Sequence, residues 1–196
     1  MVWESHLKAD PPLLTMVPEW LHEDDAAITE TRIFTLRSRR GVSPTRPQQP
    51  GEFVYIDCAD WVNVVALTAA DEVVVIEQFR HGSAEVTLEI PGGMVDPGEE
   101  PLAAGVRELA EETGYVGRGA HLIGKVNPNP AIFNNLCHTV LLRDAVAAHA
   151  PTPDLHEEIG VRLLPLAQIP EFIDAGVIHH AMVVAAFHFL ALQGGK

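Results

Sequence analysis

The chain has 196 residues, with 13 Lys and Arg against 27 Asp and Glu, and a formal net charge of −14 at pH 7. This length suits one domain with a modest extension, and a hydrophobic share of 47% excludes a disordered or fibrous chain. The negative charge opposes binding to nucleic acid and to anionic membranes unless cations intervene. A multivalent cation is therefore an early expectation.

The two cysteines, Cys58 and Cys137, lie far apart and in apolar stretches, without the spacing of metal ligands. They are typical of reduced residues within strands, which fits a reducing cytoplasm. The N-terminal residues lack the features of a signal peptide, and the longest apolar run, 181–192, is too short to cross a bilayer. We therefore expect a cytoplasmic protein without a membrane span.

Residues 1–50 are rich in proline and irregular, and we expect them to form an N-terminal extension of a domain at 51–196. Within the extension, alternating residues at 28–36 predict one strand. The polar, basic segment 37–50 is expected to be a loop.

From residue 52 onward, short β-branched runs separated by turn residues predict a mostly antiparallel sheet. The expected strands are 53–58, 62–68, 73–78, 87–90, 121–126, 136–142 and 159–164. A helix is expected from Pro101, which suits the first helical position, to Thr113, after which Gly114 supplies a left-handed end. Two more helices are expected at 170–175 and 179–192.

The helix expected at 101–113 is the most informative segment. At about 100° per residue, it places an apolar set on one face and an acidic set on the other. The apolar set is Leu102, Val106, Leu109 and Ala110, and the acidic set is Glu108, Glu111 and Glu112. A solvated acidic face is the common interpretation of such a pattern. Like charges at this spacing repel one another, however, and the negative end of the helix dipole adds to the repulsion, so a cation would stabilise them.

Carboxylates without neighbouring His or Cys ligands favour Mg²⁺ or Mn²⁺ over zinc, and Mg²⁺ commonly shares its ligands with substrate phosphates. Arg107 lies four residues before Glu111 and can hold that carboxylate by a charged hydrogen bond. The glycines of the preceding loop allow the backbone to approach an ion or a diphosphate. The segment therefore predicts a site for a divalent ion and a phosphate.

The segment from Gly93 to Tyr115 resembles the Nudix box, G-x5-E-x7-R-E-U-x-E-E-x-G-U, where U is a bulky apolar residue. The positions in register are Gly93, Glu99, Arg107, Glu108, Leu109, Glu111, Glu112 and Gly114, and only Tyr115 departs mildly from the pattern. The resemblance implies an α/β fold, namely an α/β/α sandwich with a mixed, largely antiparallel sheet and an N-terminal strand extension. It also implies metal-dependent hydrolysis of a nucleoside diphosphate linked to another group.

The same resemblance implies roles for the residues of the box. Glu108 and Glu112 would be the main metal ligands, with Glu111 in support and the backbone carbonyl of Gly92 as a further ligand. Arg107 and Glu99 would orient the helix, and Arg107 together with Glu111 would belong to the catalytic centre.

The flanking segments, including IEQFRHG, TLEIPGG and the C-terminal stretch, resemble the ADP-ribose and nucleotide-sugar pyrophosphatase branch over about residues 28–192. In that branch an arginine matching Arg80 contacts the substrate phosphates, although a plain surface arginine is the alternative. A glutamate before the last strand is the general base, which indicates Glu157 with Glu158 in reserve; an acidic surface turn is the alternative. Trp61 is a candidate to stack on a base or a partner subunit, and core packing is the other interpretation.

Two further features qualify the resemblance. Relatives selective for ADP-ribose tend to have a glutamate after S-P-G, at the position where this chain has Asn135, so the sugar side of the substrate stays open. No histidine is assigned a catalytic role, and His179 and His180 are expected to cap or flank the last helix.

We therefore expect hydrolysis of the pyrophosphate bond of ADP-ribose or a related nucleoside diphosphate sugar, with Mg²⁺ or Mn²⁺ as cofactor, giving a nucleoside monophosphate and a sugar phosphate. The alternatives are another Nudix substrate, such as GDP-mannose, a dinucleoside polyphosphate or an oxidised nucleotide, and a module that senses ADP-ribose without cleaving it. The resemblance also implies a homodimer that exchanges N-terminal segments. No nucleic acid or membrane partner is expected.

Overall fold

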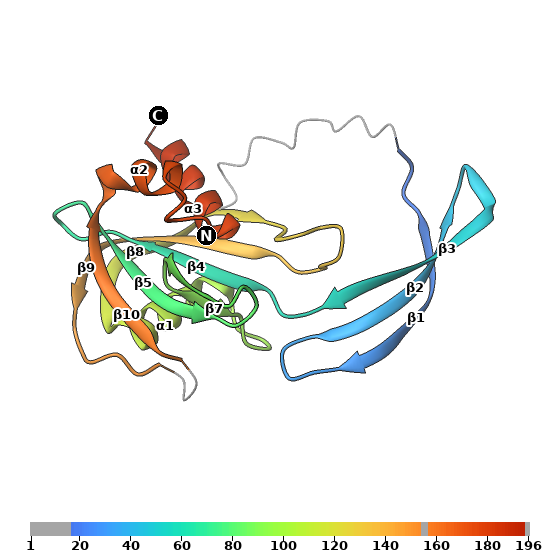
Figure 1. Cartoon of the computed structure of the whole chain (residues 1–196), viewed down its shortest axis with the longest axis horizontal. Coiled ribbons are helices and arrows are strands. Elements are labelled where there is room, and N and C mark those ends of the chain that lie inside the picture. The colour runs from blue at the N-terminus through green and yellow to red at the C-terminus, as the bar shows by residue number, and fades with distance from the viewer. Residues whose placement is uncertain (1–16, 154–156, 195–196) are drawn as a thin grey trace. The chain divides into compact units, whose positions relative to one another are not determined.

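The computed structural model describes residues 17–153 and 157–194 (Figure 1). The chain divides into two compact units. The first comprises Met1–Cys58 with Asn129–Asn134, and the second comprises Ala59–Pro128 with Asn135–Lys196. The boundary expected at residue 50 therefore falls inside a strand of the first unit, β3 (Arg46–Asp57).

The first unit contains a three-stranded antiparallel sheet in the order β1 (Leu21–Glu30), β2 (Thr35–Ser43) and β3. The predictions of one strand at 28–36 and a loop at 37–50 are wrong. Thr31 closes a turn inside the predicted strand, because its Oγ1 accepts the N–H of Phe34 at 3.0 Å and donates to the carbonyl of Phe34 at 2.7 Å. The predicted loop forms strands because main-chain hydrogen bonds between strands do not require apolar side chains.

The second unit contains two sheets that together confirm the expected mixed, largely antiparallel arrangement. Its strands are β4 (Trp61–Ala66), β5 (Glu72–Arg80), β6 (Glu85–Glu89), β7 (Gly92–Met94), β8 (Tyr115–Val126), β9 (Cys137–Ala147) and β10 (Ile159–Pro165). One sheet has the order β10-β5-β6, and the other has the order β7-β4-β9-β8 with a single parallel pair, β4 and β9. Strand β7 was not expected, since glycine is a weak strand former.

The helices of the second unit lie close to their predicted positions. They are α1 (Pro101–Thr113), the short η1 (Leu166–Gln168), α2 (Ile169–Asp174) and α3 (Ala181–Gln193). Gly114 ends α1 as predicted, with a φ of 72° and its N–H donated to the carbonyl of Ala110 at 2.8 Å. Within the described residues, none of the helices is both long and apolar enough to span a membrane.

Alternate residues of β4 face two different hydrophobic clusters, as the period of a strand requires. One cluster joins β4 to α1 and includes Val62, Val64, Ala66, Ala104 and Leu109. The other joins it to α2 and α3 and includes Val65, Leu67, Ile169, Val183 and Phe187. Helices thus cover both sides of the sheets in this unit, which confirms the expected α/β/α sandwich.

Candidate functional site

Helix α1 packs on the sheet more closely than its apolar pattern predicted. Gly105 faces the sheet, where an added Cβ would lie 2.9 Å from a methyl group of Val140 and 3.1 Å from one of Val62. The packed stripe therefore follows Ala104, Gly105 and Leu109, whereas Val106 is 42% exposed. The prediction that Val106 belongs to the packing face is wrong, because close approach at a glycine rotates the buried stripe.

This rotation also divides the acidic residues that were expected to share one open face. Glu112 turns toward the sheet and is only 3% exposed, whereas the side chain of Glu111 is 47% exposed. Glu108 lies between these extremes, with most of its side chain covered. The expected simple division into an apolar face and an acidic face is therefore wrong.

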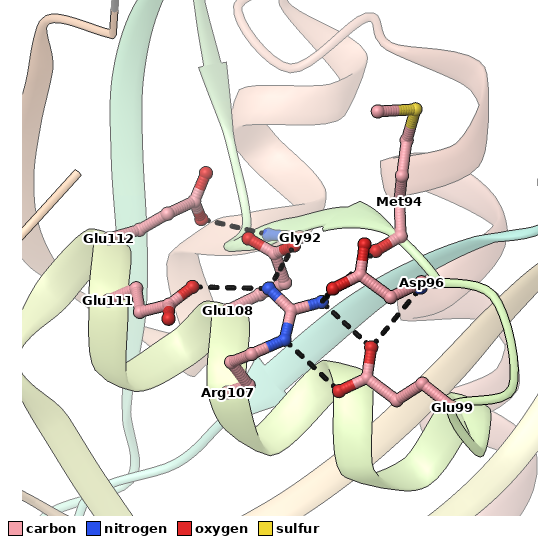
Figure 2. A network of polar contacts seen from close by, with 8 residues as sticks. All are labelled: Gly92, Met94, Asp96, Glu99, Arg107, Glu108, Glu111 and Glu112. Carbon is pink, nitrogen blue, oxygen red and sulfur yellow. Dashed lines mark hydrogen bonds and ion pairs between the residues drawn. The ribbon is translucent and has the colours of Figure 1, made fainter. Parts of the chain in front are cut away.

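Arg107 is the centre of a polar network that joins α1 to the loop before it (Figure 2). Its Nε and Nη2 donate to both carboxylate oxygens of Glu99 at 3.0 and 2.9 Å. Its Nη1 donates to Glu108 at 2.9 Å and to Glu111 at 3.1 Å, and Nη2 also donates to the carbonyl of Met94 at 3.2 Å. The hydrogen bonds that Arg107 donates to Glu99 contribute most to raising the pKa of Arg107, so the guanidinium stays charged and fixes three carboxylates.

Two glycines of β7, Gly92 and Gly93, allow close contacts with β4 and with α1. A Cβ on Gly93 would overlap the carboxylate of Glu108, so only glycine allows Glu108 its place. The N–H of Gly92 donates to Oε2 of Glu112 at 2.9 Å (Figure 2). A Cβ on Gly92 would overlap the backbone of β4 at Val62. These contacts explain why a glycine pair precedes the acidic helix.

The electrostatics of Glu108 and Glu112 indicate a shortage of positive charge. Burial raises the pKa of Glu112 to about 8, and the charges of Glu108 and Glu157 add to that effect. Burial also raises the pKa of Glu108, against the opposing charge of Arg107. A cation beside these carboxylates would stabilise their ionised forms.

The donor set suits a hard cation such as Mg²⁺, since it consists of carboxylate and carbonyl oxygens. Within the residues that the structure describes, no three His, Cys, Asp or Glu side chains already converge as a complete metal site. The mostly covered carboxylate of Glu108 and the buried carboxylate of Glu112, which is bound by the N–H of Gly92, nevertheless fit such an ion. Its positive charge would offset the burial and the repulsion that raise their pKa values.

Two site residues that were predicted outside α1, Glu157 and Arg80, act electrostatically on the carboxylates of that helix. The charge of Glu157, in the segment before β10, raises the pKa of both Glu108 and Glu112. The charge of Arg80, at the end of β5, acts on Glu112 in the opposite direction. Glu158 is exposed. The fold thus brings together residues from α1, β5 and the segment before β10.

The other two positions singled out in the sequence, Trp61 and Asn135, lie at or near the start of β4. Trp61 is partly buried at the start of β4, where it pairs with Met94 on one side and Cys137 on the other. Asn135 is buried, and its amide donates to the carbonyl of Ala59 at 3.0 Å. In this chain Asn135 therefore connects two segments of backbone.

Two residues beside Arg80 were missed by the sequence analysis, namely Glu89 and His180. Glu89 is 2% exposed, and it accepts hydrogen bonds from Arg80 at 2.8 and 2.7 Å and from His180 at 2.8 Å. The available signal was a single acid between two apolar residues of the strand predicted at 87–90, because a carboxylate that is buried requires partners. The partner His180 lies 91 residues away in the chain, so no local pattern could indicate it.

Known protein sequences and structures are similar to much of this chain. A sequence model described as the NUDIX domain matches residues 59–187, beginning at the first residue of the second unit. ADP-ribose pyrophosphatase of Bacillus subtilis (strain 168) is 27% identical over 133 residues, which cover 67% of this chain and 72% of that protein. ADP-sugar pyrophosphatase of Mus musculus is 34% identical over 126 residues, covering 61% of this chain and 58% of that protein.

A third relative carries a different name. Methanol dehydrogenase activator of Bacillus methanolicus is 28% identical over 133 residues, covering 67% of this chain and 72% of that protein. Among solved structures, an ADP compounds hydrolase superposes with a TM-score of 0.76 over 91% of this chain and 96% of that chain, at 20% sequence identity. At 20% identity, this similarity shows that the two chains share a fold.

Proposed function

Since the chain belongs to the NUDIX family, we propose that it hydrolyses the pyrophosphate bond of ADP-ribose or a related nucleoside diphosphate sugar, releasing a nucleoside monophosphate and a sugar phosphate. The observation that carries this proposal is the pair of covered carboxylates, Glu108 and Glu112, whose pKa values are raised beside Gly92. The names of the bacterial and mouse relatives support the substrate class.

The proposed cofactor is Mg²⁺ or Mn²⁺, held by the carboxylates of Glu108 and Glu112 and by the carbonyl of Gly92, with Glu111 in support. When bound, such an ion polarises phosphoryl oxygens and makes a coordinated water more acidic. Arg107 keeps Glu108 and Glu111 in place through the hydrogen bonds from its Nη1.

The remaining roles belong to residues outside the helix. Glu157 accepts the proton of the attacking water as general base, and Glu158 is the second candidate for this role. Arg80 donates hydrogen bonds to the diphosphate, for which a planar guanidinium is well suited. Trp61 is the proposed stacking residue for the base. The electrostatic influence of Glu157 on Glu108 and Glu112 supports its choice over Glu158.

The active form is proposed to be a cytoplasmic homodimer that pairs through the first unit. All ten residues of β1 are exposed, and Pro18, Trp20 and Phe53 line an open apolar groove on this unit. The two free cysteines fit a reducing compartment. Light scattering should give about twice the chain mass of 21.3 kDa, and a mass near that of one chain would contradict the dimer.

A substrate panel tests the proposed reaction. The purified chain would be incubated with ADP-ribose, other ADP-sugars, GDP-mannose, a dinucleoside polyphosphate and an oxidised nucleotide, with Mg²⁺ and Mn²⁺ in turn. Chromatography should detect AMP and ribose 5-phosphate from ADP-ribose. Cleavage of only the dinucleoside polyphosphate or the oxidised nucleotide would contradict the proposed substrate class, and cleavage of GDP-mannose alone would contradict the preference for ADP-ribose. Tight binding of ADP-ribose without products would instead support a sensing module.

A further inference from the structure

Glu89 is a buried carboxylate outside the acidic helix, and it is surrounded by hydrogen-bond donors. Arg80 donates from Nε to Oε1 at 2.8 Å and from Nη2 to Oε2 at 2.7 Å. Thr87 donates from Oγ1 to Oε1 at 2.5 Å, and Nδ1 of His180 lies 2.8 Å from Oε2. Burial opposes ionisation of Glu89, but these hydrogen bonds outweigh it and lower its pKa. An ionised carboxylate can only accept, so the Nδ1 of His180 carries the proton in this contact.

Glu89 binds two nitrogens of the Arg80 guanidinium and leaves the third available for another ligand. The pair is bidentate, which fixes both the position and the plane of the guanidinium. The third nitrogen, Nη1, makes no hydrogen bond or ion pair within the part of the chain that the structure describes, and the side chain is 43% exposed. The charge of Arg80 also acts on Glu112 of the acidic helix. The guanidinium is therefore fixed on one edge and open on the other, beside the carboxylates of α1.

The residues of this cluster come from three different elements. Arg80 ends β5, Glu89 ends β6, and His180 is the residue that precedes the first turn of α3. A free arginine loses much rotamer entropy when it binds an anion, and a fixed arginine has lost that entropy before the anion arrives. A buried carboxylate with this many donors is therefore well suited to preorganise a binding group.

We propose that Glu89 and His180 are positioning residues that hold Arg80 as a preorganised clamp for the diphosphate of the substrate. His180 ties the start of α3 to this clamp through the oxygen that it shares with Arg80. The inference rests on the proposed function, because the clamp serves a diphosphate substrate.

The first test compares Glu89→Gln with the wild type in the hydrolysis of ADP-ribose with Mg²⁺. We expect kcat/KM to fall about 100-fold, with a rise in KM, because the clamp acts on bound phosphate and a small misplacement is costly. Glu85→Gln is the matched control, since Glu85 lies on the same strand and pairs with His179 at the surface at 3.9 Å. The control should stay within about twofold of the wild type.

A double-mutant cycle separates positioning from general damage to the fold. If Glu89 acts through Arg80, then Glu89→Gln should have almost no further effect on kcat/KM in a chain that already carries Arg80→Ala. Fully additive losses would overturn the inference.

His180 provides an independent variant if Glu89→Gln does not fold. His180→Asn retains an N–H donor near the place of Nδ1, whereas His180→Ala removes it. We expect about a tenfold loss of kcat/KM for His180→Ala and recovery of most of it in His180→Asn. Equal losses in the two variants, or no loss in His180→Ala, would overturn the role of His180.

Calorimetry with α,β-methylene-ADP and Mg²⁺ distinguishes failure of the clamp from failure of the proposed function. Binding should weaken in Glu89→Gln and in Arg80→Ala but not in Glu85→Gln. If the wild type cleaves no nucleotide sugar yet shows this binding pattern, the proposed function fails and the clamp stands. If the wild type cleaves ADP-ribose and a folded Glu89→Gln matches it in both kinetics and binding, the clamp fails and the proposed function stands.

Discussion

Glu89 and Glu112 are both buried glutamates of the second unit, 2% and 3% exposed, yet their pKa values move in opposite directions. Burial disfavours the charge of both. Glu89 overcomes this cost with hydrogen bonds from Arg80, His180 and Thr87, which lower its pKa. Glu112 accepts one N–H from Gly92 and lies near the charges of Glu108 and Glu157, so its pKa is raised to about 8.

This difference shows that burial alone does not decide the role of a carboxylate. Glu89 has a complete set of protein partners, which is typical of a group that supports another residue. Glu112 lacks sufficient positive charge among its protein neighbours, which is typical of a group that binds a cation. The two glutamates should therefore respond differently to substitution, to removal of divalent ions and to pH.

The largest expected effect is on catalysis by Glu112→Gln. The substitution keeps the shape of the side chain and removes the charge that an ion requires, so kcat should fall more than about 100-fold with little change in folding. Steady-state kinetics with ADP-ribose and Mg²⁺ would measure it. The matched control is Glu100→Gln, an exposed acid just before the same helix, which should retain full activity. Wild-type kcat in Glu112→Gln would refute the metal-binding role.

The two glutamates should also differ in stability without divalent ions. Glu89→Gln should lower the free energy of unfolding by about 2–4 kcal/mol, because it breaks the ion pair between a buried carboxylate and the partly exposed guanidinium of Arg80. Glu112→Gln should raise that free energy at pH 8, because it removes a buried and poorly compensated charge. Urea unfolding of both variants in EDTA checks this contrast. Equal destabilisation of the two would contradict it.

The raised pKa of Glu112 predicts how stability changes with pH. Between an ordinary glutamate pKa of 4.5 and the raised value of about 8, the folded chain binds more protons at this site than the unfolded chain. Glu112 therefore makes the ion-free protein less stable as pH rises through this range, by about 4 kcal/mol. Thermal unfolding in EDTA should show this decline, and saturating Mg²⁺ or Glu112→Gln should remove it. A decline that is unchanged in Glu112→Gln would locate it elsewhere.

Gly93→Ala tests the position of Glu108 with a smaller change. The added Cβ would overlap the carboxylate of Glu108, so the carboxylate must move away from Gly93. We expect about a tenfold loss in kcat/KM and a higher Mg²⁺ requirement. Gly82→Ala is the control, since a Cβ at Gly82 meets no atom within 4 Å. Unchanged Mg²⁺ dependence in Gly93→Ala would contradict this account.

The smallest effect is expected for Val106→Ala, which tests the rotated packing of α1. Val106 is 42% exposed, so its truncation should change the free energy of unfolding by less than about 0.5 kcal/mol. Leu109→Ala, at a fully buried position of the same helix, should cost about 2–5 kcal/mol. Similar losses of unfolding free energy in the two variants would show that Val106 belongs to the packing face, as the sequence predicted.

The local features of this protein could be predicted from its amino-acid sequence. The bounds of α1, its start at Pro101 and its end at Gly114 agree with the prediction, because these signals act within a few residues. The NUDIX family was also predictable, since the spacing of Arg107 and the glutamates lies within one helix and its preceding loop. Arg107 reaches Glu99 and Glu111 over only eight and four residues.

The orientation of these features within the fold depends on contacts between distant parts of the chain. The approach of Gly105 to the sheet turned Glu112 inward and left Val106 outside, which no helical projection could foresee. Main-chain pairing made strands of the basic segment at 37–50. The contact of Glu89 with His180 joins residues 91 positions apart. Packing and strand pairing depend on distant partners, and distance along the chain carries no information about them.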